Sequence, residues 1–129
     1  MNTKLVMSVS AVAMGLAGIA LSFIPQEILN YFSATNHSQL DVIVLQLLGA
    51  IYFGFAMTNW AAKANLIGGI YARPIAIGNL SHFVIGALAL LKAYSSSQQL
   101  VLLIPAIVYA LFAISFAWIF FTHPVKEQA

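Results

Sequence analysis

Four long runs of apolar residues dominate this sequence and leave little chain between them. They cover about residues 4–24, 42–62, 75–93 and 100–122. The hydrocarbon core of a bilayer is about 30 Å thick and needs roughly 20 apolar residues in a helix, so each run is long enough to cross it once. Only 6% of the residues are charged, whereas about a quarter are charged in a soluble domain. The sequence therefore predicts an all-α, polytopic membrane protein, a single bundle of four transmembrane helices over residues 1–129.

The first run has two interpretations. Gly18 and Ala20 could mark the cleavage site of a signal peptide. However, Lys4 alone is a weak positive start, and the apolar run is long for the core of a signal peptide. We therefore favour a membrane-spanning helix.

Each of the four runs has a side that we expect to face the interior of the bundle, including the side of the third run with His82 and that of the fourth with Tyr109. Small side chains let helices approach closely in lipid, and in the first run they recur every three or four positions, at Ser8, Ala11, Gly15, Gly18 and Ser22. In the second run the expected inner side mixes polar, small and bulky residues: Gln46, Gly49, Ala50, Phe53, Met57 and Trp60.

The connections between the runs carry turn-forming residues. Pro25 suits the first position of a short helix, and Glu27 would lie near the positive end of that helix. Residues 95–99 are polar and are predicted to form a loop. Pro105 falls within the first two turns of the last run and should bend that helix.

The positions of the basic residues predict the orientation in the membrane. Cytoplasmic loops carry more Lys and Arg than outer loops. Four basic residues would lie on one side: Lys4, Lys63, Arg73 and Lys126. Only Lys92 lies near the other side, which also holds the acidic loop of residues 25–41. We therefore expect a multi-pass protein of the inner (cytoplasmic) membrane with both termini in the cytoplasm.

A few polar residues within the runs form the main site hypothesis. His82 is ionisable, and by helix rise it and Tyr109 should lie near the middle of the bilayer, with Asn79 toward the cytoplasm and Gln46 toward the outside. Such a cluster could bind the polar head of a ligand or pass a proton through His82. In the simpler interpretation these side chains only join helices through hydrogen bonds worth about 1 kcal/mol or less each. No span contains Asp or Glu, which favours this simpler interpretation.

Two further kinds of site were weighed. Lys63 and Arg73 could hold anionic lipid headgroups near the cytoplasmic face, or could serve only as topological anchors. Haem held between two histidines is not expected, because His37 and His123 lie at or beyond the ends of the runs. Only a homodimer could pair two copies of His82. We expect no metal and no cofactor.

Motif absences limit the function further. The sequence has no Cys, no phosphate-binding Gly loop followed by Lys, no HExxH, no GxSxG and no pair of carboxylates in a span. Five Lys and Arg residues are too few for a nucleic-acid surface. We expect a structural or interaction protein, such as a homo-oligomer or an accessory subunit of a larger membrane complex. The alternative is a module that binds or transports a lipid or small apolar molecule around His82, and an enzyme is ranked last.

The stretch Leu48–Lys92, LGAIYFGFAMTNWAAKANLIGGIYARPIAIGNLSHFVIGALALLK, covers about a third of the chain. It resembles small bacterial four-helix membrane proteins that carry no assigned activity. The number and size of the expected helices are also similar to those of DoxX-like four-helix proteins. These resemblances imply a four-helix membrane fold, and neither implies catalytic residues.

Overall fold

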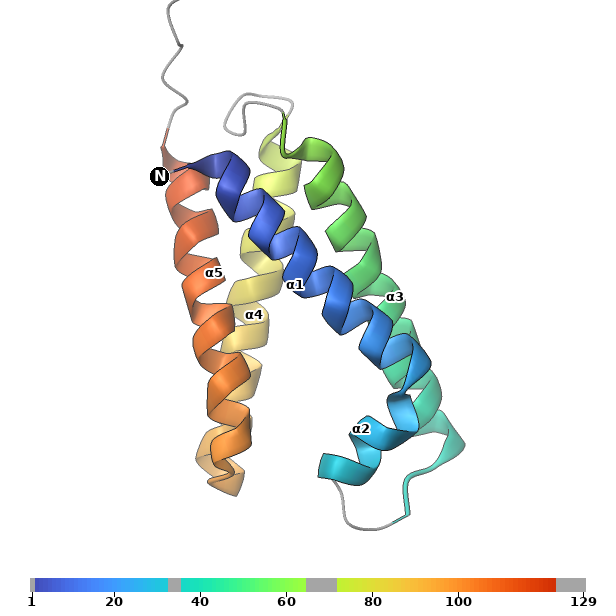
Figure 1. Ribbon diagram of the computed structural model, residues 1–129. Helices are drawn as coiled ribbons and strands as arrows, with labels where there is room; N and C mark the ends of the chain where they lie inside the picture. Colours follow the sequence, from blue (N-terminus) through green and yellow to red (C-terminus); the bar gives the residue numbers. More distant parts are fainter. Residues whose placement is uncertain (1, 33–35, 65–71, 123–129) are drawn as a thin grey trace, which may run out of the picture. The chain divides into compact units, whose positions relative to one another are not determined.

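The computed structural model describes residues 2–32, 36–64 and 72–122, and all of its regular structure is helical (Figure 1). The elements are α1 (Thr3–Phe23), α2 (Pro25–Phe32), α3 (Gln39–Ala62), α4 (Arg73–Ser97), the 3-10 turn η1 (Leu100–Leu102) and α5 (Leu103–Phe121). These three ranges contain no strand, so the all-α prediction is confirmed for them. Four segments are long and apolar enough to cross a membrane, namely α1, α3, α4 and η1 with α5, in agreement with the four predicted spans.

A capping interaction places the start of α3 three residues before the second apolar run. The backbone N–H and the hydroxyl of Ser38 both donate to Oδ2 of Asp41, at 2.7 and 2.9 Å. The backbone N–H of Asp41 donates in return to Oγ of Ser38, at 3.3 Å. This reciprocal arrangement satisfies backbone donors that the first turn of a helix leaves without intrahelical acceptors.

The end of α4 corrects the predicted loop at residues 95–99. The helix continues through Ser97. The hydroxyls of Ser96 and Ser97 donate to backbone carbonyls four residues earlier, at 3.1 and 2.8 Å, so these polar side chains are satisfied within the helix. The helix ends where Gln98 adopts a left-handed conformation with φ of 56°. Polarity alone was therefore a poor guide to the end of this helix.

The two prolines in helices lie in first turns. Pro25 is the first residue of α2 and Glu27 is in its first turn, as predicted. Pro105 is the third residue of α5 and follows the 3-10 turn η1. A proline in a first turn lacks an N–H that has no intrahelical acceptor in any case. Because η1 precedes α5 directly, the bend predicted at Pro105 stays a prediction.

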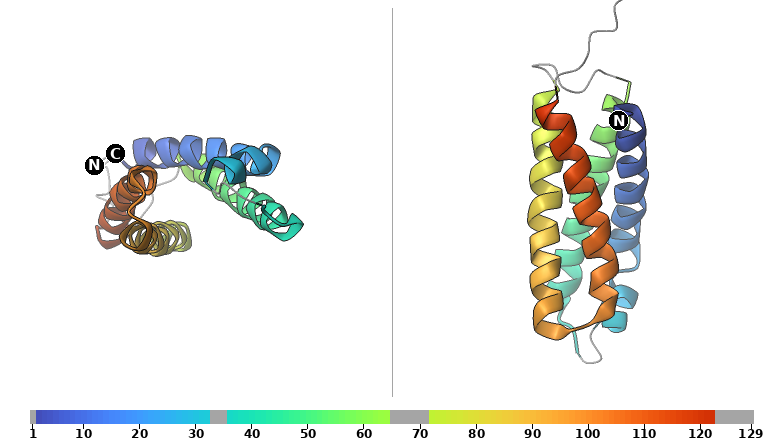
Figure 2. Two further views of the ribbon diagram at one scale, coloured as in Figure 1. Left: turned by 90° about the horizontal axis from the view of Figure 1, so that it is seen from below. Right: turned by 90° about the vertical axis from the view of Figure 1, so that its left-hand side faces the viewer.

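The chain divides into two compact units, which are described separately below. The N-terminal unit, residues 7–61, contains most of α1, all of α2 and most of α3. The C-terminal unit, residues 1–6 and 62–129, contains α4, η1 and α5. Within it, α4 and α5 lie side by side and run in opposite directions, as the views of Figures 1 and 2 agree. The packing of all four spans into one domain remains a prediction.

In the N-terminal unit, α1 and α3 approach each other at glycines. A Cβ atom added to Gly18 would lie 2.8 Å from the backbone nitrogen of Phe53 and 2.9 Å from the carbonyl oxygen of Gly49. One added to Gly15 would lie 3.6 Å from Cβ of Ala56. The small-residue side predicted for the first span therefore does pack against another helix, and that helix is α3.

The residues that α3 buries agree only in part with the side predicted to face inward. Gly49 is buried as expected, but Phe53, Met57 and Trp60 are 45%, 54% and 49% exposed. The residues that α3 buries are Val42, Gly49, Ala56, Asn59 and Ala62. Both sides of a membrane helix are apolar, because lipid rather than water lies outside, so an aromatic residue is no sign of the interior.

Candidate functional site

An aromatic cluster joins α4 to α5 in the C-terminal unit. Phe83 on α4 is almost fully buried. Its ring stacks on Phe112 and Phe116 of α5, with centroids 4.8 and 5.7 Å away, and meets Tyr109 edge-on at 5.2 Å. Aromatic pairs in this range contribute about 0.5–1.5 kcal/mol each beyond their burial. These contacts fix the position of Tyr109 relative to α4.

Tyr109 lies directly over Gly86, because only glycine leaves room for its ring. A Cβ atom added to Gly86 would lie 2.5 Å from Cδ1 of Tyr109 and closer still to Cε1. His82 is one helical turn before Gly86, and its ring centroid is 5.5 Å from that of Tyr109. The structure thus brings together two residues of the predicted polar cluster, His82 and Tyr109.

The hydroxyl of Tyr109 is buried and has no hydrogen-bond partner among the described residues. A buried polar group left in this state costs about 1–3 kcal/mol. Such a group in a native protein calls for an explanation, for example a bound polar molecule. A buried phenol hydroxyl therefore lies beside an imidazole ring at the contact between α4 and α5.

Asn79 is on the same helix as His82, three residues earlier, and is buried. Its side-chain amide donates to the backbone carbonyl of Ile75, at 2.9 Å, within α4. The amide donor of Asn79 is therefore used in part by its own helix. This bond suits a role in the packing of α4.

Gln46 belongs to the N-terminal unit, whereas Asn79, His82 and Tyr109 belong to the C-terminal unit. Its amide nitrogen donates to the backbone carbonyl of Ser22, at 3.4 Å, which joins α3 to α1. The residue is exposed. Within its own unit, Gln46 connects two helices, as the simpler of the two sequence interpretations expects.

A buried polar pair in the N-terminal unit was missed from the sequence. The amide nitrogen of Asn59 donates to Oγ of Ser10, at 3.1 Å, and that hydroxyl donates to the carbonyl oxygen of Met7, at 3.0 Å. Ser10 and Asn59 are both fully buried. The signal available was an amide within an apolar run, one position before the more conspicuous Trp60. The pair sets the register of α1 against α3.

The basic residues of the second connection lie at helix ends. Lys63 is half-buried and directly follows α3, and Arg73 is the exposed first residue of α4. Residues 65–71 between them lie outside the described residues, as does His123, which was weighed as a haem ligand. Within residues 2–32, 36–64 and 72–122, no group of three or more His, Cys, Asp or Glu side chains is placed to hold a metal ion.

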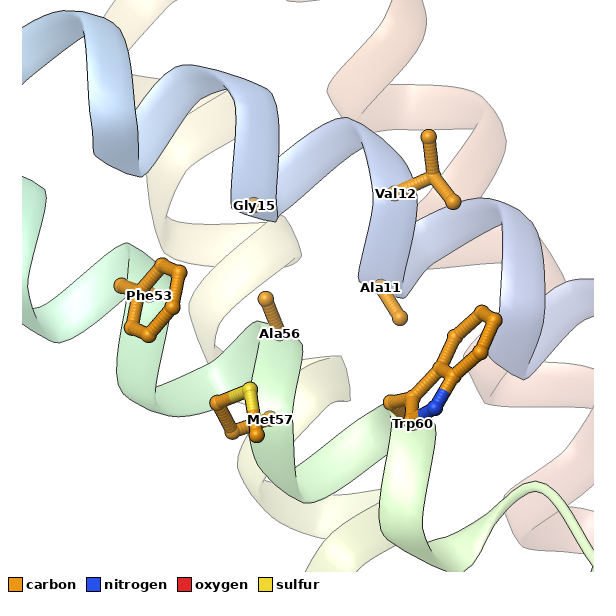
Figure 3. A pocket seen from close by; sticks show the side chains of 7 residues that line it. All are labelled: Ala11, Val12, Gly15, Phe53, Ala56, Met57 and Trp60. Atoms are coloured by element: carbon orange, nitrogen blue, oxygen red, sulfur yellow. The ribbon is translucent and has the colours of Figure 1, made fainter.

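An apolar groove runs between α1 and α3. It has a volume of about 250 Å³, and Ala11 and Ala56 point into it, with Phe53 toward one end and Trp60 at the other (Figure 3). A second hollow of about 400 Å³ continues past Phe53 toward Phe23.

Comparisons with protein-family models, with curated proteins and with solved structures gave no match to this chain.

Proposed function

We propose that this protein is a multi-pass protein of the bacterial inner (cytoplasmic) membrane whose C-terminal unit binds a small, largely apolar molecule beside Tyr109 and His82. The observation that carries the proposal is the buried hydroxyl of Tyr109, which has no hydrogen-bond partner among the described residues. Packing alone would be served equally well by phenylalanine, because the ring already contacts Phe83 and Gly86. A ligand oxygen would give the hydroxyl a function.

The surroundings of Tyr109 support this proposal. The ring of His82 lies next to it, so a hydroxyl donor and a second polar group lie side by side. Phe83 also lies beside Tyr109 and stacks in turn on Phe112, and such aromatic side chains suit the apolar body of a ligand. A few placed polar groups within an apolar lining are the usual composition of a small-molecule site.

Native mass spectrometry of protein released gently from its own membrane tests the proposal. We expect the wild-type protein to carry a bound molecule that is reduced in Tyr109→Phe and absent in His82→Leu. Tyr94→Phe makes the same chemical change elsewhere on α4 and serves as the matched control. If the wild type and all three variants carry the same molecules, Tyr109 and His82 form no binding site.

A structural or interaction role, as a homo-oligomer or an accessory subunit, is the second candidate. The observation that favours it is a small-residue side of α3 that stays exposed, at Ala50, Gly54, Thr58 and Ala61. A Cβ atom added to Gly54 would meet nothing within 4 Å. The same mass spectra test this candidate, since it expects a multimer or a second protein and no small molecule.

The orientation belongs to the same proposal: both termini face the cytoplasm, and Lys63 and Arg73 contact anionic headgroups there. The charge distribution along the sequence supports this orientation. Because the chain has no Cys, a single cysteine introduced at either end reports its side without background. A membrane-impermeant thiol reagent should leave both cysteines unlabelled in intact cells and label them after lysis. Labelling of both cysteines in intact cells would show that the termini lie on the opposite side of the membrane.

A further inference from the structure

Charged residues are confined to the ends of the apolar runs throughout this sequence. Between Arg73 and Lys92 there is none, and α5 contains none. The runs that form α1 and α3 likewise have none between Lys4 and Glu27 or between Asp41 and Lys63. Whatever surrounds Tyr109 and His82 in the folded protein, no Lys, Arg, Asp or Glu of this chain comes from the middle of a span.

The depth of the site leads to the same conclusion. By helix rise, His82 lies about 14 Å from Arg73 and about 15 Å from Lys92 along α4. These distances are close to half the thickness of the hydrocarbon core, which is about 30 Å. Phospholipid headgroups lie at the surface of that core. The head of a phospholipid in the bilayer would therefore not reach the hydroxyl of Tyr109.

We infer that the ligand of this site is an uncharged lipid or apolar molecule that resides in the bilayer interior and carries a carbonyl or hydroxyl oxygen. This inference rests on the function proposed above. The oxygen accepts a hydrogen bond from Oη of Tyr109, and the aromatic side chains contact the apolar remainder. An anionic head would need protonated His82 as its partner, and placing two charges deep in a bilayer is costly.

Four probes separate this ligand class from others. The first is a long dialkyl ketone with its carbonyl at the centre of the chain, and the second is the alkane of the same length. The third is an alkyl phosphate of the same length, and the fourth is the matching fatty acid. Each is added to the full-length protein in nanodiscs of a neutral phospholipid. Binding is measured by native mass spectrometry and by the rise in thermal unfolding temperature, which grows with ligand affinity.

We expect the ketone to bind the wild type about two- to tenfold more tightly than the alkane, which is the usual contribution of one neutral hydrogen bond. The infrared C=O stretching frequency of the bound ketone should be lower than that of the ketone in lipid, both in the wild type and in Tyr94→Phe. In Tyr109→Phe the frequency should equal the value in lipid. In the ligand-free state Tyr109→Phe should unfold at the same or a higher temperature than the wild type, which shows that the variant is folded.

Other results would overturn the inference in distinguishable ways. If the ketone and the alkane bind equally and Tyr109→Phe changes neither, the site takes apolar molecules but the oxygen-bearing class is wrong. If the alkyl phosphate or the fatty acid binds best, the ligand is charged and the inference fails while the binding function stands. If no probe binds and no molecule is released with the protein, the proposed function fails as well.

Discussion

The close approach of α1 and α3 makes a sharp prediction about Gly18. In Gly18→Ala the added methyl group would lie 2.8 Å from the backbone nitrogen of Phe53 and 2.9 Å from the carbonyl oxygen of Gly49. Non-bonded carbon contacts are normally about 3.5–4.0 Å long, so the helices must separate by at least about half an ångström. Both atoms belong to the backbone, and therefore no side-chain rotation can relieve the contact.

The magnitude follows from two opposing effects. Adding a methyl group to a packed contact that cannot yield typically costs about 1–3 kcal/mol. Alanine is favoured over glycine inside a helix by up to about 1 kcal/mol. We therefore expect Gly18→Ala to lower the free energy of unfolding by about 1–2 kcal/mol. The matched control is Gly54→Ala on α3, where the methyl group meets nothing within 4 Å and only the helix preference acts.

The two tryptophans allow the effect to be assigned to the N-terminal unit. Trp60 lies in that unit and Trp118 in the other, so a Trp118→Phe background leaves a single fluorophore. Unfolding of the purified protein is followed as a denaturing detergent replaces a mild one, by Trp60 fluorescence and by circular dichroism. Gly18→Ala should unfold earlier than the background protein, and Gly54→Ala at the same point or later. Equal midpoints for the two glycine variants, or the reverse order, would refute the close contact.

Three other changes test the described contacts. Removing the bond between Ser10 and Asn59 through Ser10→Ala and Asn59→Leu should give a coupling energy of about 0.5–1.7 kcal/mol in a double-mutant cycle of unfolding, and additive single effects would contradict the bond. Phe83→Ala should lower the free energy of unfolding by about 3–5 kcal/mol, because Phe83 is about 1% exposed. Unfolding is followed by Trp118 fluorescence in a Trp60→Phe background, and a loss below about 1 kcal/mol would contradict the aromatic cluster. Gly86→Ala should displace the ring of Tyr109 and abolish the bound molecule in native mass spectra. If the variant still carries that molecule, binding does not depend on the position of the Tyr109 ring.

Much of the helical layout could be predicted because it depends on local features. Four apolar runs of spanning length correspond to the four spanning segments. The repeat that contains Gly15 and Gly18 predicted a close helix contact, and the structure has that contact. Pro25 predicted the start of α2 because a helix tolerates proline best in its first turn. The length of an apolar run and the steric limits of glycine and proline depend on residues close together in the chain, so both can be predicted from the sequence.

The side of each helix that faces inward was harder to predict. In water, an apolar stripe marks the buried face, but in lipid both faces are apolar and the signal is lost. Phe53 and Met57, on the predicted inner side, line the groove against α1 but are about half exposed, and Asn59 was overlooked although it is fully buried. Polarity was a better guide in α4, where Asn79 is buried and His82 adjoins Tyr109.

The predicted cluster could not be assembled from helix positions alone. His82 and Tyr109 meet because Phe83 and Gly86 determine how α4 receives the ring, and neither contact follows from the spacing of polar residues. Depth in the bilayer and the side of each helix were the only coordinates available from the sequence. Gln46, expected further toward the outside, donates to the backbone carbonyl of Ser22 within the N-terminal unit, and its place relative to His82 and Tyr109 stays a prediction.

The glycine contact between α1 and α3 also bears on how the chain is made. Gly18 and Gly49 are about thirty residues apart with α2 between them, whereas α4 and α5 are neighbours in sequence. Synthesis proceeds from the N-terminus, so α1 enters the membrane before its partner exists. During that interval its small-residue side faces lipid or the insertion machinery, while the later α4–α5 hairpin can enter already paired. A membrane chaperone that shields an orphan helix would therefore act on α1, between the insertion of the first span and that of α3.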